Sequence, residues 1–195
     1  RSDQGLTEEG IAFVDHAIDL GLAIDLSHAN EATFEGLIEV VSQKQKEPQT
    51  RIICYASHSN IRSLRDHKRN LNDEQLEKLR KVGGSIGIVG YPSFLTPSIE
   101  KRDIEKSYLE HVKYAVKKMG IDHVLVSSDN MDWIKAFAAE NGSDPALYAY
   151  DKMTHDLRTL LEREFTRSET SQIMQGNAKK VYTKIKSNRI LKPYN

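Results

Sequence analysis

Two histidines and an aspartate each follow a short apolar run, at the position where a buried strand would end. His28 closes the run 21–28, His58 closes the run 51–58, and Asp129 closes the run 121–129. Imidazole nitrogens and carboxylate oxygens are ligands that zinc takes at about 2.0–2.2 Å. If the three strands are parallel neighbours, these side chains meet at one edge of a sheet, where a bound metal would activate water for hydrolysis.

The spacing of the two histidines leaves a second interpretation open. They are 30 residues apart, so they do not form a local zinc motif such as His-x-x-x-His. The metal hypothesis therefore depends on their positions at strand ends. The alternative is that each imidazole only bonds a backbone carbonyl where its strand stops.

The other histidines and the single cysteine are expected to lie outside such a site. Four histidines are expected in solvent, because they fall in helical patterns or in a basic segment: His16, His111, His155 and His67. His123 comes early in its strand, far from the mouth, and is expected to be structural. Cys54 excludes an internal disulfide and is expected to be a small buried hydrophobe.

Residues 60–70 form an unusually basic segment just beyond His58, too irregular to be only a helix. Its last guanidinium, that of Arg69, could hold a substrate carboxylate through two parallel hydrogen bonds. Most charged loops, however, are simply solvated, so the residue type alone leaves this role open.

Helical patterns separate the apolar runs. Thr7, Asn30 and Asn72 are expected to cap three helices, the last with Gln75 at the third position of a capping box. A further apolar run, 84–91, ends in Tyr91, and a loop marked by Pro92 and Pro97, a helix 104–119, a polar insertion to about residue 145 and two or three C-terminal helices follow.

This alternation predicts an α/β fold with a parallel sheet, because each helix returns the chain to the start of the next strand. Polar residues at the strand ends are typical of a β/α barrel with its site at the C-terminal edge. Four units do not close a barrel of eight. The sequence is thus either a small open α/β domain or half of a larger barrel.

Composition is that of one globular domain: 195 residues, 38% hydrophobic and 29% charged. Lys plus Arg and Asp plus Glu are both 28, which gives no charge argument for a nucleic-acid or lipid-surface partner. The apolar runs are shorter than the roughly 20 residues of a membrane helix. We expect a cytoplasmic location by default, and a natural polypeptide that begins upstream of Arg1.

Taken together, the motifs resemble the C-terminal half of the membrane dipeptidase (renal dipeptidase) family, zinc dipeptidases of the amidohydrolase superfamily. The matching stretches are Asp25-Leu-Ser-His28, Ser57-His-Ser-Asn60, the run 66–75, Gly120-Ile-Asp-His-Val with Ser128-Asp129, and Gly176-Asn177. They extend over nearly the whole chain in the family's order, which makes the resemblance far more specific than any one motif.

The resemblance implies strands five to eight of a (β/α)8 TIM barrel, with residues 1–195 as a single region and the N-terminal half absent from this chain. It implies two zinc ions per complete site, with His28 and His58 as ligands of one of them. It assigns Arg69 to the substrate carboxylate, Tyr91 to the pocket wall, and Asp129 to the attacking water and its proton. The expected reaction is hydrolysis of a dipeptide amide bond by a metal-activated water.

Two departures from the family keep alternatives open. The family's His-x-Asp pair, bridging Glu and further His have no match here, so this chain alone is expected to be inactive until a missing half or partner chain completes it. A homo-oligomer is left open as a separate partner. After Asp129 the chain reads Asn-Met-Asp-Trp133 instead of the family's usual Phe-Asp-Gly. The alternatives are a related metal-dependent amidohydrolase acting on another amide, ester or lactam, and a non-catalytic half-barrel remnant.

Overall fold

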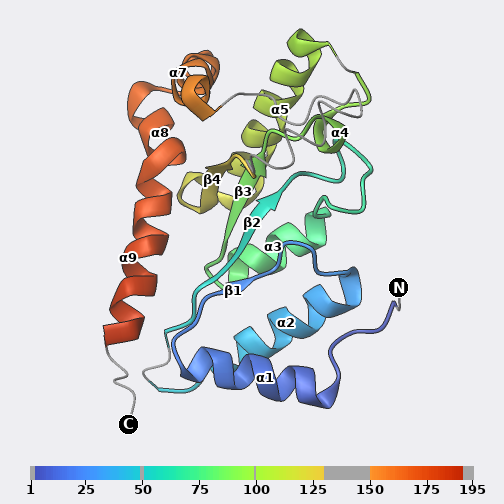
Figure 1. Cartoon of the computed structure of the whole chain (residues 1–195), viewed down its shortest axis with the longest axis vertical. Helices are drawn as coiled ribbons and strands as arrows, with labels where there is room; N and C mark the ends of the chain where they lie inside the picture. Colours follow the sequence, from blue (N-terminus) through green and yellow to red (C-terminus); the bar gives the residue numbers. More distant parts are fainter. Residues whose placement is uncertain (1–2, 49–50, 99, 130–149, 191–195) are drawn as a thin grey trace.

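The computed structural model describes residues 3–48, 51–98, 100–129 and 150–190. Its centre is a parallel sheet in which the strands stand in sequence order, β1-β2-β3-β4 (Figure 1). The strands are β1 (Ile24–Asp25), β2 (Cys54–Ser59), β3 (Ser85–Val89) and β4 (Val124–Ser127). The predicted α/β fold with a parallel sheet is therefore confirmed, and the carboxyl ends of the strands lie at one edge.

The helices that precede β4 comprise three that begin at the predicted caps, one turn that was not predicted, and one helix that begins three residues before the predicted residue 104. They are α1 (Glu8–Asp19), α2 (Glu31–Lys44), α3 (Asp73–Lys81), the single turn α4 (Pro92–Leu95) and α5 (Lys101–Met119). Thr7 and Asn30 cap α1 and α2, and Asn72 forms the capping box with Gln75. The loop expected around Pro92 contains α4, because proline is well suited to a first helical position.

The C-terminal region is helical and packs against β4. It comprises the 3₁₀ turn η1 (Ile121–His123) before β4, then α7 (Tyr150–Leu161), α8 (Arg167–Ser171), the π-helical η2 (Gln172–Gly176) and α9 (Asn177–Ile190). Figure 1 shows α8 and α9 along one side of the sheet and α1 to α3 on the other. Buried Asn177 joins the two parts, since its Nδ2 donates to the carbonyls of Ile121 and Val124 at 2.7 and 2.8 Å.

Close contact between neighbouring strands fixes the sheet at the level of the site. All five residues of β3 are buried, and a Cβ at Gly87 would lie 2.1 Å from the carbonyl oxygen of Ser57 in β2. Only glycine lets the two backbones approach this closely. The β2 register also shifts between Ala56 and Ser59, and such a bulge re-aims the side chains within it.

The observed strands are shorter than the predicted apolar runs. The run 21–28 contributes only the two residues of β1 to the ladder, because β1 is an edge strand that pairs with β2 alone. The polar insertion expected before residue 145 lies outside the described residues. No helix in the described part of the chain is long and apolar enough to cross a membrane.

Candidate metallohydrolase site at the carboxyl edge

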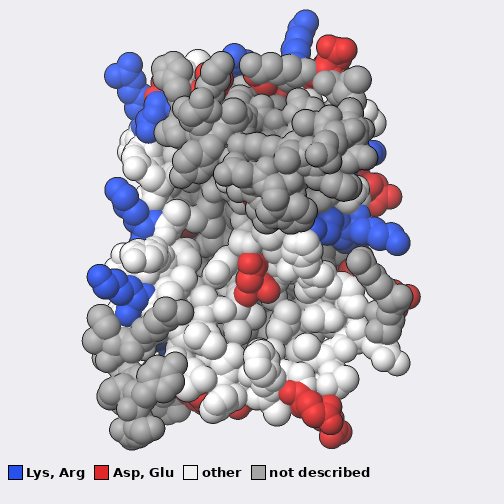
Figure 2. Space-filling view, viewed as in Figure 1, with Lys and Arg blue, Asp and Glu red and all other residues white. Residues whose placement is uncertain are grey.

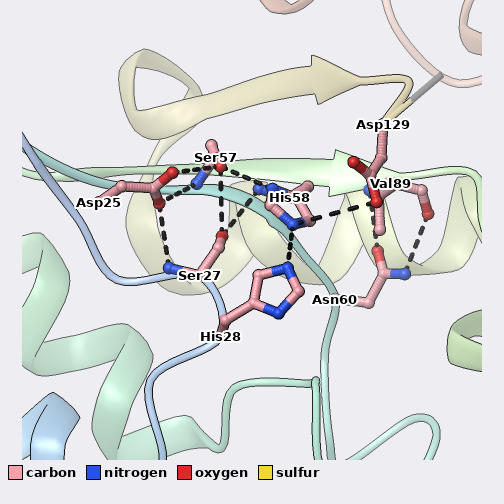
Figure 3. A network of polar contacts seen from close by, with 8 residues as sticks. All are labelled: Asp25, Ser27, His28, Ser57, His58, Asn60, Val89 and Asp129. Carbon is pink, nitrogen blue, oxygen red and sulfur yellow. Dashed lines mark hydrogen bonds and ion pairs between the residues drawn. The ribbon is translucent and has the colours of Figure 1, made fainter. Parts of the chain in front are cut away.

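The two predicted histidine ligands meet. Nε2 of His28, three residues beyond β1, lies 2.9 Å from Nε2 of His58 in β2 (Figure 3). The rings are edge to face, with centroids 5.0 Å apart. These two residues are called the histidine pair below. The two parallel strand ends thus direct two ring nitrogens at one point, as the sequence predicted.

Asp129 approaches the same point from beyond β4. Its Oδ2 lies 4.0 Å from Nε2 of His58, and the two side chains are 30% and 16% exposed. This distance places the carboxylate within reach of a small group lying between the two residues. The altered turn that follows Asp129 lies outside the described residues.

Backbone strain is concentrated at this site. Among the described residues, two that are not glycine have positive φ: His28 at 73° and Asp129 at 45°. Such conformations cost on the order of 1 kcal/mol or more and persist where surrounding contacts impose them, often at functional sites. Both strained residues belong to the predicted site, and this signal does not depend on their residue type.

A network of hydrogen bonds supports the histidine pair from behind. Asp25 Oδ1 accepts from the backbone N–H groups of Ser27 and Ser57, both at 3.0 Å. Asp25 Oδ2 accepts from Ser57 Oγ at 2.6 Å, and Ser57 Oγ lies 2.7 Å from Nδ1 of His58. Ser27 Oγ accepts from the His58 backbone N–H at 3.0 Å. Sequence analysis assigned no role to Asp25, Ser27 or Ser57, although all three belong to the quoted motifs.

Asn60 extends the sheet just past the histidine pair. Its fully buried side chain donates to the carbonyl of Val89 at 3.0 Å and accepts from the Val89 N–H at 3.2 Å. The amide thus replaces a backbone partner where β2 has ended, as Figure 3 shows. This contact sets the spacing between β2 and β3 at the level of His58.

The basic segment folds into a closed loop, residues 61–71, called the arginine loop below. Its ends are joined by hydrogen bonds from Arg62 N to Leu71 O and from Leu71 N to Asn60 O, both 2.8 Å. Arg62 forms an ion pair with Glu31, and Arg65 Nε donates to the Ser93 carbonyl at 3.4 Å. The loop is therefore a folded element with a buried interior.

Arg69 differs from the other arginines of this loop. Its Nε and Nη2 atoms are buried, and neither has a hydrogen-bond partner among the described residues. The guanidinium carbon lies 5.4 Å from the ring centroid of Phe94, a cation–π contact. Burial lowers the pKa of Arg69, and the charges of Asp129 and Asp25 oppose that shift. Arg69 thus presents unpaired donors near the two carboxylates of the site.

Aromatic rings line the region between the arginine loop and α4. The Phe94 ring lies 4.8 Å from that of Tyr91 and 4.5 Å from that of His67, measured between centroids. Tyr91 is 37% exposed, and its predicted place in a pocket wall stays a prediction. Phe94 was not singled out from the sequence, and its position in a proline-marked segment gave no signal for it.

Electrostatics favour a neutral imidazole at His28. Burial lowers its pKa, and the positive charges of Arg69 and His58 act in the same direction, against Asp129 and Asp25. A neutral imidazole is the form that binds a metal ion. The charges and burial at the site therefore favour the neutral state of His28 that a metal ligand requires.

The histidine pair fits part of a zinc ligand set. Two nitrogens bound to one tetrahedral zinc would be separated by roughly 3.3 Å, and the observed 2.9 Å between the Nε2 atoms requires only a small spread. Ser57 on Nδ1 of His58 matches the outer hydrogen bond that metal-bound histidines usually make. No group of three or more His, Cys, Asp or Glu side chains in the described ranges could hold a metal, so within those ranges the histidine pair offers two ligands, one fewer than the three protein ligands usual for a catalytic zinc site.

Expectations for the remaining histidines and the cysteine had mixed outcomes. His111 was predicted to lie in solvent, and this prediction was wrong. The residue is 1% exposed, its Nδ1 accepts from the Ile61 N–H at 3.0 Å, and burial lowers its pKa to about 4. Its place between Tyr108 and Ala115 on the apolar face of α5 could have indicated this.

His16 is exposed and His67 half-buried, and the side chain of His155 lies outside the described part. His123 is structural, bonding the Gly84 carbonyl, and buried Cys54 has its pKa raised to about 12 by burial.

Comparisons with known proteins identify the family of this chain. The family model described as membrane dipeptidase (Peptidase family M19) matches residues 1–192, so the chain belongs to that family. A curated relative, an uncharacterized dipeptidase of Schizosaccharomyces pombe, is 30% identical over 128 residues, which are 65% of this chain and 28% of the relative.

Two solved structures share the fold. A probable dipeptidase of Pseudomonas aeruginosa has a TM-score of 0.70 at 22% identity, over 94% of this chain and 55% of its own. A metallopeptidase of Rhodobacter sphaeroides, liganded with a phosphinate mimic of the dipeptide L-Ala-D-Ala, has a TM-score of 0.69 at 22% identity, over 93% and 48%. The chain thus spans about half the length of these structures.

Proposed function

We propose that this chain is the C-terminal half of a (β/α)8 zinc dipeptidase and supplies part of its metal site. The observation that carries this proposal is the convergence of His28, His58 and Asp129 at one edge of a parallel sheet. Membership of the membrane dipeptidase family supports the reaction class. The sheet order β1-β2-β3-β4 supports strands five to eight of a barrel, because sequential parallel strands are the barrel arrangement.

His28 and His58 would hold one of two zinc ions through their Nε2 atoms. Bound zinc acidifies water and polarises a carbonyl, which is the chemistry that amide hydrolysis needs. Each imidazole must be unprotonated at Nε2 to act in this way. The chain's own contribution is therefore to keep the two Nε2 atoms directed at one point.

Asp129 would handle the proton of the reaction. As water adds to the peptide carbonyl it loses a proton, and the leaving amine must gain one when the C–N bond breaks. A carboxylate 4.0 Å from His58 Nε2 lies close enough to accept the first proton and deliver the second. Asp129 has a positive φ of 45° here, a backbone conformation that persists where surrounding contacts impose it.

Arg69 would bind the free carboxylate of the dipeptide, with Tyr91 in the pocket wall. Two buried guanidinium nitrogens without a partner among the described residues are costly in a folded chain, and a substrate carboxylate would satisfy them with charge-assisted hydrogen bonds. Recognition of a terminal carboxylate also limits the substrate to a short peptide whose C-terminal residue reaches the arginine.

A complementary barrel half, on the same polypeptide or on a partner, would supply the other ligands. Strands β1 and β4 are the edges of the described sheet, and edge strands invite further pairing. Figure 2 shows few charged side chains across the lower centre of the face seen in Figure 1. Ile11, Phe13 and Leu22 are large apolar residues that are 40% to 74% exposed, as expected where additional structure covers them.

The test is the variant His58→Ala in the protein completed with its other barrel half. We expect about two zinc ions per complete site in the wild type, and a fall in dipeptide kcat/KM of at least 1,000-fold in the variant. His16→Ala is the matched control, because His16 is an exposed imidazole on α1. Unchanged hydrolysis in His58→Ala would refute the metal role. Hydrolysis of esters or lactams in preference to a dipeptide panel would favour the related amidohydrolase.

A further inference from the structure

Ser27 and Ser57 contact His58 from the side away from Asp129, and Asp25 bonds both serines behind them (Figure 3). Their hydrogen bonds have a direction that follows from elementary chemistry. A carboxylate has no proton to donate and can only accept hydrogen bonds. The direction of the contact between Asp25 and Ser57 therefore determines the proton positions further along the network.

The hydroxyl of Ser57 has one proton, which it donates in a hydrogen bond to Asp25. The distance of 2.6 Å between Asp25 Oδ2 and Ser57 Oγ is typical of a charge-assisted O–H···O⁻ bond. Both backbone N–H groups that reach Asp25 Oδ1 need an acceptor there as well. Having donated to Asp25, Ser57 Oγ can only accept from Nδ1 of His58, 2.7 Å away.

His58 must then carry its proton on Nδ1. A neutral imidazole has one ring proton, so Nε2 of His58 has a free lone pair. We propose that Asp25 and Ser57 are positioning residues that lock His58 in the Nδ1-protonated tautomer and so keep its Nε2 ready for a metal ion. The inference rests on the proposed function for what binds at Nε2, but the tautomer itself is a property of this chain.

The other histidine follows from the same argument. The contact of 2.9 Å between the two Nε2 atoms needs one donor, and His58 offers a lone pair, so His28 is the donor in the metal-free chain. A metal ion binding to both nitrogens would displace that proton from Nε2 of His28. The two histidines of the pair thus differ: His58 is fixed in its ligand form, while His28 must change.

Asp25→Asn reverses the network at almost constant shape. The amide oxygen can still accept from the two backbone N–H groups, while the amide nitrogen would face Ser57 Oγ and donate to it. Ser57 would then donate to Nδ1, and the proton of His58 would move to Nε2, where it blocks a metal. A purely structural role of Asp25 would leave the tautomer unchanged, because the backbone contacts remain.

The experiment records two-bond ¹H–¹⁵N correlations of the histidine rings in the metal-free 195-residue chain, followed by titration with Zn²⁺ alone. We expect a protonated Nδ1 on His58 in the wild type and a protonated Nε2 in Asp25→Asn, with zinc affinity lowered about 10-fold to 100-fold. Ser57→Ala should lower the affinity similarly, and Ser57→Thr, which keeps the hydroxyl, should restore it.

The controls separate this inference from unfolding and from the proposed function. Asp122→Asn is the matched control, because exposed Asp122 also accepts side-chain hydrogen bonds, from Gln172 and Lys180, near the opposite end of β4. If Asp25→Asn fails to fold, the wild-type tautomer and the Ser57 variants still decide. A wild-type His58 protonated on Nε2, or an unchanged tautomer and zinc affinity in Asp25→Asn, would overturn the inference. The expected tautomers in a completed protein without dipeptidase activity would instead refute the proposed function alone.

Discussion

The histidine pair and the arginine loop lie at the same edge of the sheet but differ in how the chain treats their polar atoms. At the histidine pair, Asp25, Ser27 and Ser57 satisfy one another and fix His58 from behind. In the arginine loop, the backbone is well bonded while the guanidinium of Arg69 has two buried nitrogens without partners among the described residues. The first region is organised by its own hydrogen bonds, whereas in the second the described residues leave two buried donors unsatisfied.

This difference teaches where stability and function should separate. A fully bonded network contributes to folding as well as to the site, so changes there should affect both. Burial of an unpaired guanidinium costs stability. If Arg69 serves recognition, as proposed above, its removal should affect binding without lowering stability. Three variants and one change of pH test this difference between the two regions.

Gly87→Ala should break the histidine side most severely. The new Cβ would lie 2.1 Å from the Ser57 carbonyl oxygen and 3.2 Å from Ser127 Cβ, so β2 and β3 must separate. We expect the free energy of unfolding to fall by about 3 kcal/mol or more, measured by urea denaturation. Gly176→Ala is the control, because the atoms nearest its added Cβ are 3.7 Å or more away. Equal stability of the two variants would contradict the close packing.

Acid should destabilise the start of the arginine loop by protonating His111. Its pKa of about 4 in the folded chain lies below the unfolded value near 6.5. The unfolded chain therefore binds the proton first, and stability is lost as the pH falls from about 6.5 to about 4. The loss from this group should approach about 3 kcal/mol.

His111→Asn isolates this effect. The amide oxygen can accept from the Ile61 N–H as Nδ1 does, but the side chain does not titrate. Burial also lowers the pKa values of His28 and His67, and these residues remain in the variant, so the difference between the two pH profiles reports His111. Urea denaturation at a series of pH values measures it, and parallel profiles would show that His111 is not the sensor.

Sequence reasoning found the groups of this site and missed the contacts that fix them. The positions of His28, His58 and Asp129 follow from apolar runs that end at one sheet edge, and the caps Thr7, Asn30 and Asn72 follow from local patterns. The contacts between Asp25 and Ser57 depend on the bulge in β2 and on the register with β1, which no local pattern sets. The prediction that His111 lies in solvent was wrong because it followed the polar residue type, whereas the helical spacing places His111 on the apolar face of α5.

Arg69→Met tests the other side of the comparison in the completed enzyme. Loss of a charge-assisted pair with the substrate carboxylate should lower kcat/KM for the dipeptide about 100-fold, mainly by raising KM. A 100-fold change corresponds to about 2.7 kcal/mol. Stability should stay the same or rise, because the unpaired buried donors are gone. For a dipeptide amide, which lacks the carboxylate, kcat/KM should fall little in the variant.

The control for Arg69 lies in the same loop. Arg65→Met removes a guanidinium whose Nε bonds the Ser93 carbonyl, and it should leave KM for the dipeptide within a few-fold of the wild type. If Arg69→Met lowers the rates for the dipeptide and its amide equally, the arginine does not recognise the carboxylate.

Asn70→Ala should produce the smallest effect and connect the two sides. Fully buried Asn70 donates to the carbonyls of Arg65 and Phe94 at 2.9 and 2.8 Å, so it ties the arginine loop to the ring beneath Arg69. Its loss should cost about 2 kcal/mol of unfolding free energy and raise KM several-fold. Asn177→Ala removes a similar pair of bonds at the far end of β4 and should cost similar stability without changing KM. If both variants raise KM alike, general loosening of the fold explains the effect and Asn70 does not specifically place Arg69.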